Sequence, residues 1–168
     1  MLSLLIREVE QVDTPFLWEM LYHAAHMAED GATHWETAKE VPFLTQYVQD
    51  WGQPGDFGLI AVDTKSRQKV GAAWLRLLIE DKTSVTYQDD ETPELAIAIV
   101  PDWIGCGVGT ALMTRLVESA RQRYPALVLS VRADNPAIRL YQRFGFVETE
   151  QIVNRVGTIS YKMLLKFE

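Results

Sequence analysis

A continuous apolar run near the middle of the chain, followed by a glycine-rich turn and an amphipathic helix, constrains the fold more than any other feature. Residues Leu95–Val100 are apolar throughout and are bounded by Pro93 and Pro101, a pattern typical of a strand that is buried on both faces. The apolar spacing over Thr110–Arg123 predicts a helix with one buried face. A buried strand that leads through a glycine turn into such a helix indicates an α/β arrangement.

Apolar periodicity predicts one α/β (α+β) domain over residues 1–168, because 168 residues are enough to enclose a continuous core. We expect a mixed central sheet of about six to seven strands, flanked by about four helices. The other expected strands are Ser3–Glu10, Phe57–Asp63, Val70–Glu80, Leu127–Val131, Phe146–Val153 and Thr158–Phe167. The other expected helices are Phe16–Met27, Val41–Trp51 and a short helix between Asn135 and Gly145.

The charge balance argues against nucleic-acid and membrane partners. Sixteen Lys and Arg residues against 23 Asp and Glu residues leave a net charge of -7, which disfavours a surface that neutralises phosphates or anionic lipid. The most apolar stretch, residues 70–79, is interrupted by Arg76 and is shorter than the roughly 20 residues that cross a bilayer. A single cysteine and a start without an extended apolar stretch predict a cytoplasmic protein.

The turn Pro101–Thr110 carries three alternate glycines, Gly105, Gly107 and Gly109. Glycines before a helix leave room for a ligand beside backbone amides, and the positive end of the helix dipole favours phosphate or pyrophosphate there. A flexible connection without a ligand is the alternative. The turn lacks the lysine of a P-loop, and its spacing differs from the dinucleotide-binding fingerprint. A nucleoside triphosphate is therefore disfavoured, and a nicotinamide dinucleotide is a weaker alternative.

Two motifs together resemble the GNAT superfamily of acyl-coenzyme A dependent N-acyltransferases. The segment Ile104–Gly109 is similar to the glycine loop of that family, with Ile104 where Arg or Gln is usual. The segment Asp134–Phe146 is similar to the second and more specific signature of the family. With the preceding hairpin, the resemblance covers roughly Phe57–Phe167, whereas the first 56 residues match only in the order of their helices.

The resemblance implies that acetyl-coenzyme A is the acyl donor. It implies that the coenzyme pyrophosphate binds the amides of Gly105, Cys106, Gly107, Val108, Gly109 and Thr110. It also implies that the pantetheine arm pairs with the backbone of Ile99 and Val100, with Ile97 as a further candidate, and that Asn135 caps a helix and touches the pantetheine or a water. Because Ile104 lacks the usual polar side chain, we expect weaker or differently oriented cofactor contacts.

The resemblance also implies catalytic roles for Tyr141 and Glu94. Acyl transfer to an amine needs a base for the amine proton and an acid for the departing thiolate. Tyr141 resembles the general acid of the family, and an aromatic residue of the core is the alternative. Glu94 precedes the central strand, where several family members place a carboxylate that removes the amine proton directly or through water. The alternative for Glu94 is a solvated residue of the acidic loop from Asp81 to Glu94.

The predicted function is therefore N-acetyl transfer to a primary amine by direct attack in a ternary complex. The acceptor is an unidentified small molecule or peptide, with His34 and Trp35 as candidates for recognising it, and a homodimer is a further expectation. A noncatalytic acyl-coenzyme A binding domain with a regulatory role is the first alternative, and a nicotinamide-dependent oxidoreductase is the second. The two alternatives differ in the cofactor that they bind: the first binds coenzyme A, and the second binds a nicotinamide dinucleotide and not coenzyme A.

The histidines and the cysteine do not form a recognisable metal-binding or nucleophilic motif in the sequence. His23 and His26 are spaced to share one side of a helix, but a third metal ligand is not identifiable. We therefore expect no metal site. Cys106 has no evident partner for covalent catalysis. Four tryptophans are interpreted as packing residues of the core or its rim: Trp18, Trp51, Trp74 and Trp103.

Overall fold

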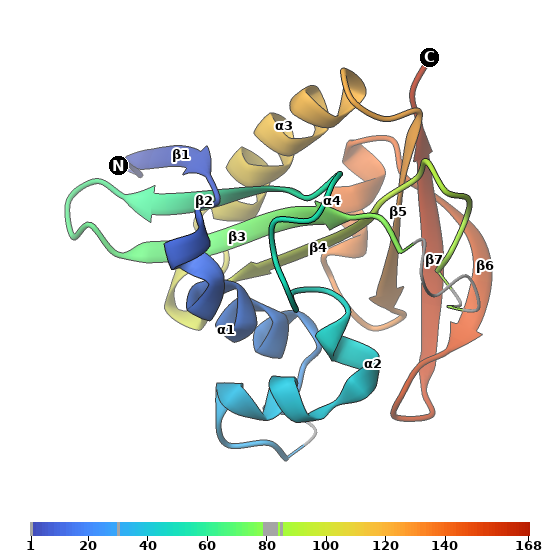
Figure 1. Ribbon diagram of the computed structural model, residues 1–168, viewed down its shortest axis with the longest axis horizontal. Coiled ribbons are helices and arrows are strands. Elements are labelled where there is room, and N and C mark those ends of the chain that lie inside the picture. Colours follow the sequence, from blue (N-terminus) through green and yellow to red (C-terminus); the bar gives the residue numbers. More distant parts are fainter. Residues whose placement is uncertain (1, 30, 79–83, 85) are drawn as a thin grey trace. The chain divides into compact units, whose positions relative to one another are not determined.

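A mixed seven-stranded sheet organises the protein, as predicted, in the part of the chain that the computed structural model describes: residues 2–29, 31–78, 84 and 86–168. The strand order is β1-β2-β3-β4-β5-β7-β6 (Figure 1). The strands are β1 Leu4–Glu8, β2 Phe57–Asp63, β3 Lys69–Arg76, β4 Glu94–Ile99, β5 Ala126–Arg132, β6 Val147–Val153 and β7 Ile159–Lys166. Two compact units share this chain, one of Met1–Leu75 with Ala96–Leu116 and one of Arg76–Leu95 with Val117–Glu168.

The helices agree with the prediction in number but not in every length. Over the described residues they are α1 Thr14–Ala24, α2 Pro42–Thr45, α3 Val108–Arg121 and α4 Ile138–Arg143, with 3-10 turns at Gln11–Asp13, Trp35–Glu40 and Pro101–Trp103. No described helix is long and apolar enough to cross a membrane. The strand predicted over Val70–Glu80 is described only to residue 78 and ends at Arg76, and residues 79 and 80 lie outside the described part.

Two predicted helices end earlier than expected. The helix predicted over Val41–Trp51 is present as α2, but its predicted end is wrong, because α2 stops at Thr45. The Thr45 hydroxyl and the Gln46 side-chain Nε2 donate to the carbonyls of Pro42 and Phe43 at 3.0 Å each, and such local bonds compete with helix propagation. The first helix stops at Ala24 rather than Met27, since His26 has a left-handed backbone with φ of 55°.

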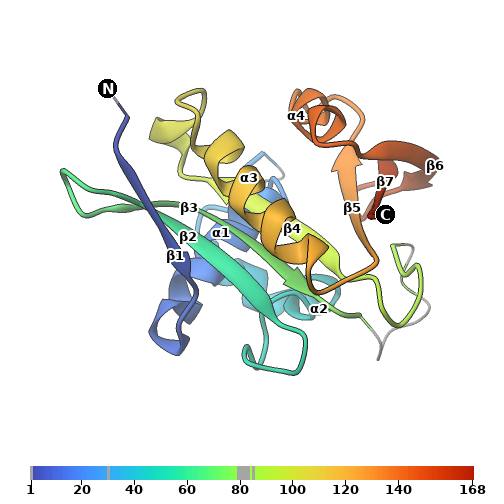
Figure 2. The ribbon, with the colours of Figure 1, turned by 90° about the horizontal axis from the view of Figure 1, so that it is seen from above.

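In the first unit, β1, β2 and β3 pair antiparallel, and the predicted hairpin is confirmed. The helix α1 lies on one face of these strands, and the start of α3 lies on the other (Figure 2). Gly71 of β3 lies on the α3 side, where an added Cβ would stand 2.9 Å from Ile99 Cδ1 and 3.2 Å from Leu112 Cδ1. A larger residue than glycine at this position would therefore push β4 and α3 away from β3.

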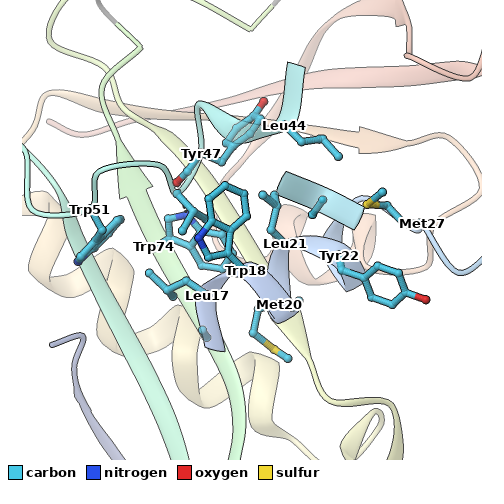
Figure 3. Close-up of a cluster of buried hydrophobic side chains, with 14 of the residues drawn as sticks. Leu17, Trp18, Met20, Leu21, Tyr22, Met27, Leu44, Tyr47, Trp51 and Trp74 are labelled. Carbon is cyan, nitrogen blue, oxygen red and sulfur yellow. Dashed lines mark hydrogen bonds between the residues drawn. The ribbon is translucent and has the colours of Figure 1, made fainter. Parts of the chain in front are cut away.

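The core of the first unit is a cluster of aromatic and aliphatic side chains on the α1 side of the strands (Figure 3). Trp74 is 1% exposed, and its indole N–H donates to the Tyr47 carbonyl at 3.0 Å, which ties β3 to the segment after α2. Trp18 and Trp51 also lie in this cluster. The prediction that these tryptophans pack in the core is confirmed, whereas Trp103 is only partly buried.

In the second unit, β7 pairs antiparallel with both β5 and β6. The strand β4 begins here, where Glu94 pairs in parallel with Val128 of β5. The turn from α4 into β6 needs Gly145, whose φ is 100°. A helix, a glycine and a strand therefore follow in the order that the second sequence motif predicts.

A buried carboxylate ties the start of α1 to two strands of the first unit. The Asp13 side chain is fully buried and accepts two hydrogen bonds from the Arg7 guanidinium, at 2.7 and 2.8 Å. Lys69 Nζ lies 2.7 Å from Asp13 Oδ1, and the Glu10 amide donates to Oδ2 at 2.8 Å. These bonds hold the pKa of Asp13 well below its ordinary value of 3.8, chiefly through Arg7.

We expect Asp13→Asn to destabilise the fold by about 3 kcal/mol, because Arg7 and Lys69 then lose the charge that balances them. Urea unfolding at pH 7 measures this loss, with exposed Asp50→Asn as the matched control. Because the pKa of Asp13 is lowered by folding, its contribution is complete above about pH 4 and disappears as the pH falls further. The assignment is contradicted if Asp13→Asn and the control have the same free energy of unfolding at pH 7. It is also contradicted if Asp13→Asn loses stability below pH 4 in the same way as the natural protein.

Candidate functional site

The glycine loop joins β4 to α3 in a conformation that requires glycine at two positions. Gly105 and Gly107 have φ of 80° and 91°, in the left-handed region that glycine adopts without strain. Both are exposed, and among the described residues a Cβ added at Gly107 would meet only Leu2, at 3.6 Å. The space around these glycines is therefore open to a ligand.

The loop presents a row of backbone donors. The Gly107 carbonyl accepts the first helical bond of α3, from the Ala111 amide at 3.1 Å, so the three amides before Ala111 in the helix have no helical acceptor. Among the described residues, no acceptor is recorded for any amide from Gly105 to Thr110. These donors stand at the positive end of a helix of 14 residues, an arrangement that binds phosphate and other anions.

The side chains of the loop add little to this donor row. Ile104 is 67% exposed and offers no polar group where the resembling family has Arg or Gln. The Cys106 thiol is exposed and makes a long contact of 3.9 Å to the Ile104 carbonyl. The chemistry of the loop is therefore that of its backbone.

The strand β4 leads directly into the loop and carries the residues predicted to pair with pantetheine. Ile97 and Ile99 are partly buried within it. Val100 follows the strand, and its amide donates to the Val70 carbonyl at 2.9 Å while its carbonyl accepts from Trp103 at 2.8 Å. The Val100 amide is thus engaged within the protein, which leaves its carbonyl as the group with remaining capacity for a ligand.

Tyr141 lies on α4 in the second unit, where burial controls its protonation. The residue is 7% exposed and packs edge-to-face against Phe146, with ring centroids 6.1 Å apart. Desolvation raises the pKa of the Tyr141 phenol far above its ordinary value of 10.0. No hydrogen bond to its hydroxyl is recorded in the described part of the chain. The phenol is therefore protonated at neutral pH, as a general acid must be.

Glu94 and Asn135 also belong to the second unit. Glu94 is 5% exposed at the first position of β4, so the interpretation as a solvated loop carboxylate is wrong. The Asn135 side chain accepts from the Ala137 amide at 2.9 Å, but the N-cap position of α4 is Ala137. Asn135 therefore caps the turn that precedes the helix, two residues before the helix N-cap, and the prediction that it caps the helix itself is wrong.

The histidines show no metal-binding arrangement. His26 pairs with Glu29 at 2.8 Å, and burial lowers the pKa of His23. No group of three or more His, Cys, Asp and Glu residues that could hold a metal occurs among the described residues.

His34 and Trp35, the candidates for acceptor recognition, begin a 3-10 turn and stack at 6.0 Å. Sequence reasoning missed Lys39, whose ammonium lies over the rings of Trp18 and Trp35. The only sequence signal was the four-residue spacing between Trp35 and Lys39.

The predicted site residues thus form two groups, each within one unit. The first unit brings together β4 and the donor row, with Ile97, Ile99, Val100 and Gly105–Thr110. The second unit contains Glu94, Asn135 and Tyr141.

Comparison with known proteins points to one family. The model of the Acetyltransferase (GNAT) family matches residues 17–146. Mycothiol acetyltransferase of Thermobifida fusca is 31% identical over 100 residues, which are 58% of this chain and 30% of that protein. The [ribosomal protein bS18]-alanine N-acetyltransferase of Haemophilus influenzae is 37% identical over 62 residues, which are 36% of this chain and 42% of that protein. This chain spans less than half the length of either curated relative.

Solved structures agree on the fold. The spermidine N-acetyltransferase from Vibrio cholerae, in complex with CoA and spermine, superposes with a TM-score of 0.65 at 20% identity, covering 97% of this chain and 95% of that chain. The family model covers more than half of this chain, including the glycine loop and the motif that carries Tyr141. The protein belongs to the GNAT acetyltransferase family.

Proposed function

We propose that the protein is an N-acetyltransferase that moves an acetyl group from acetyl-coenzyme A to a primary amine. The observation that carries this proposal is the row of amides from Gly105 to Thr110 at the start of α3, for which the described residues supply no acceptor. A pyrophosphate supplies the acceptor oxygens that such a row lacks. The membership of the chain in the GNAT family supports acetyl-coenzyme A as the donor of the acetyl group.

The proposed reaction is a direct transfer within a ternary complex. The amine nitrogen attacks the thioester carbonyl carbon, a C–N bond forms, and the C–S bond breaks. Glu94 takes the proton that the amine loses, directly or through water, and Tyr141 donates a proton to the departing thiolate. The raised pKa of the buried Tyr141 phenol supports this role, because it keeps the proton in place until the thiolate forms.

The remaining cofactor contacts are assigned to β4 and to the turn before α4. We propose that Ile97, Ile99 and the Val100 carbonyl offer backbone groups to the pantetheine arm, and that Asn135 touches the arm or a water beside it. Ile104 contributes no hydrogen bond, so the amides of the loop supply the donors for the pyrophosphate.

The acceptor is proposed to be a small-molecule or peptide amine. The curated relatives are named for mycothiol and for the alanine of a ribosomal protein, and a structural neighbour is named for spermidine. These acceptors differ widely, so they support the amine class and no single compound. A cytoplasmic location is proposed because the exposed Cys106 thiol suits a reducing compartment. A homodimer stays a prediction.

A noncatalytic domain that binds acyl-coenzyme A is the second candidate function. The exposed Ile104, in place of the usual Arg or Gln, favours it. Both candidates predict saturable binding of acetyl-coenzyme A in calorimetric titration, with no binding of nicotinamide dinucleotides. Thiol release in the presence of amines distinguishes them, since only the enzyme produces it.

Gly107→Glu tests the donor row. We expect it to weaken acetyl-coenzyme A binding by about 100-fold or more, because the carboxylate repels the pyrophosphate and occupies its space. A side chain strains the left-handed backbone at this position, but the strain falls on an exposed loop and the nearest atom to the new Cβ is at an ordinary contact distance, so the fold should persist. Gly157→Glu is the matched control, with the same charge change, an exposed position and φ of 85° in the β6–β7 turn. Equal affinities of the two variants would place the pyrophosphate elsewhere.

Tyr141→Phe tests the general acid. We expect kcat to fall about 100-fold, because the thiolate then departs without a proton from the protein. The dissociation constant for acetyl-coenzyme A should not change, since the ring is retained. In the natural protein, deprotonation of Tyr141 should not lower kcat below about pH 10, because the protonated phenol is the active form and its pKa is raised. A variant with unchanged kcat would assign Tyr141 to packing alone.

A further inference from the structure

Two indole rings of the first unit converge on one ammonium group. Lys39 Nζ lies 5.7 Å from the ring centroid of Trp18 and 5.5 Å from that of Trp35. Trp18 comes from α1, and Trp35 and Lys39 come from the 3-10 turn Trp35–Glu40. Both distances lie within the about 6 Å over which a cation is attracted to an aromatic face. We call Trp18 and Trp35 the indole pair.

The rings, rather than a carboxylate, hold this ammonium. Over the described residues, Lys39 makes no hydrogen bond or ion pair, although Glu36 and Glu40 belong to the same turn. A lysine head on an exposed side chain has water as an alternative partner, so its position over two rings indicates a favourable site for a cation.

The indole pair is held by the core, whereas its occupant is not. Trp18 is 8% exposed within the core cluster, and Trp35 packs against the same cluster. Ala38 is fully buried beside Lys39 and fixes the turn. Lys39 itself is exposed and can move away without breaking a hydrogen bond to any residue that the structure describes. The two walls would therefore remain in place after the lysine leaves.

We propose that the indole pair is a binding site for an alkylammonium group of a ligand, and that Lys39 fills this site in the free protein. An alkylammonium group carries both properties that the site selects, a positive charge and an apolar surface that contacts the rings. Glu36 and Glu40 add negative charge to the turn and favour a cation over a neutral molecule. Lys39 is displaced when the ligand binds.

The site also defines the class of acceptor, and this step rests on the proposed function. Ala96 of β4 and Val100 after it pack against the cluster that contains Trp18, and Trp35 packs against the same cluster. The indole pair therefore shares a core with the segment assigned to the pantetheine arm. An amine that attacks a thioester must be neutral, whereas a group held by the indole pair is charged. The acceptor therefore carries a second, cationic amino group.

Binding of choline tests the indole pair without any acetyl transfer. Ligand-observed NMR titrations compare the binding of choline and of 3,3-dimethylbutan-1-ol, below called dimethylbutanol, to the natural protein and to Lys39→Gln. Dimethylbutanol has the shape of choline but carries no charge, because a carbon atom replaces the nitrogen. We expect choline to bind Lys39→Gln about threefold or more tightly than the natural protein, because the resident cation is gone. Lys65→Gln, which removes an exposed lysine from the β2–β3 turn, is the matched control and should leave the affinity unchanged.

Variants of the partly exposed Trp35 avoid damage to the deeper Trp18. Trp35→Leu should abolish choline binding, and Trp35→Phe should retain part of it, with circular dichroism as the check on folding. Equal binding of choline and dimethylbutanol, or equal choline affinities of Lys39→Gln and Lys65→Gln, would overturn the site.

Transfer assays then test the acceptor class with cadaverine and n-pentylamine, which differ by one amino group. We expect Trp35→Leu to lower the preference for cadaverine over n-pentylamine, measured as the ratio of the two kcat/KM values, about fivefold. The KM for cadaverine should rise, whereas the KM for acetyl-coenzyme A should not change. An unchanged preference would overturn the acceptor assignment, although choline binding would still support the site. Choline binding without transfer to either amine would overturn the acceptor assignment and would leave the cation site supported. The proposed function itself fails only if acetyl-coenzyme A does not bind, or if no amine of a wider panel releases the thiol.

Discussion

The close approach of β3, β4 and α3 at Gly71 determines where the donor row stands. Because Gly71 has no side chain, Ile99 of β4 and Leu112 of α3 occupy the space that its Cβ would fill. Leu112 is fully buried and lies three residues after Gly109. The first turn of α3, with its free amides, is thus fixed to the sheet by a contact within the core.

In the proposed reaction, backbone conformation and burial supply much of what side-chain groups supply in other sites. The left-handed φ of Gly105 and Gly107 turns the chain just before α3, where we propose that the free amides bind the pyrophosphate. In the second unit, burial of Tyr141 retains the phenolic proton and contact with Phe146 orients the ring.

Aromatic packing connects the core of the first unit to the cation site that we propose. Trp18 belongs to the cluster under the sheet and also faces Lys39. The 3-10 turn Trp35–Glu40 supplies the second ring and the occupant. A short and irregular turn can hold such a site because the buried Ala38 fixes it to the core.

The sequence by itself determined the order of the elements, the glycine loop and the family. Strong local signals made this possible: the apolar run of β4, the glycines at left-handed positions, and the motif from Asn135 to Phe146. Only the tertiary structure decided the early ends of α1 and α2, the burial of Glu94, and the meeting of Lys39 with Trp18. Helix ends depend on competing local hydrogen bonds, while burial and cation–π contacts depend on residues far apart in the chain, and hydrophobic periodicity reports neither.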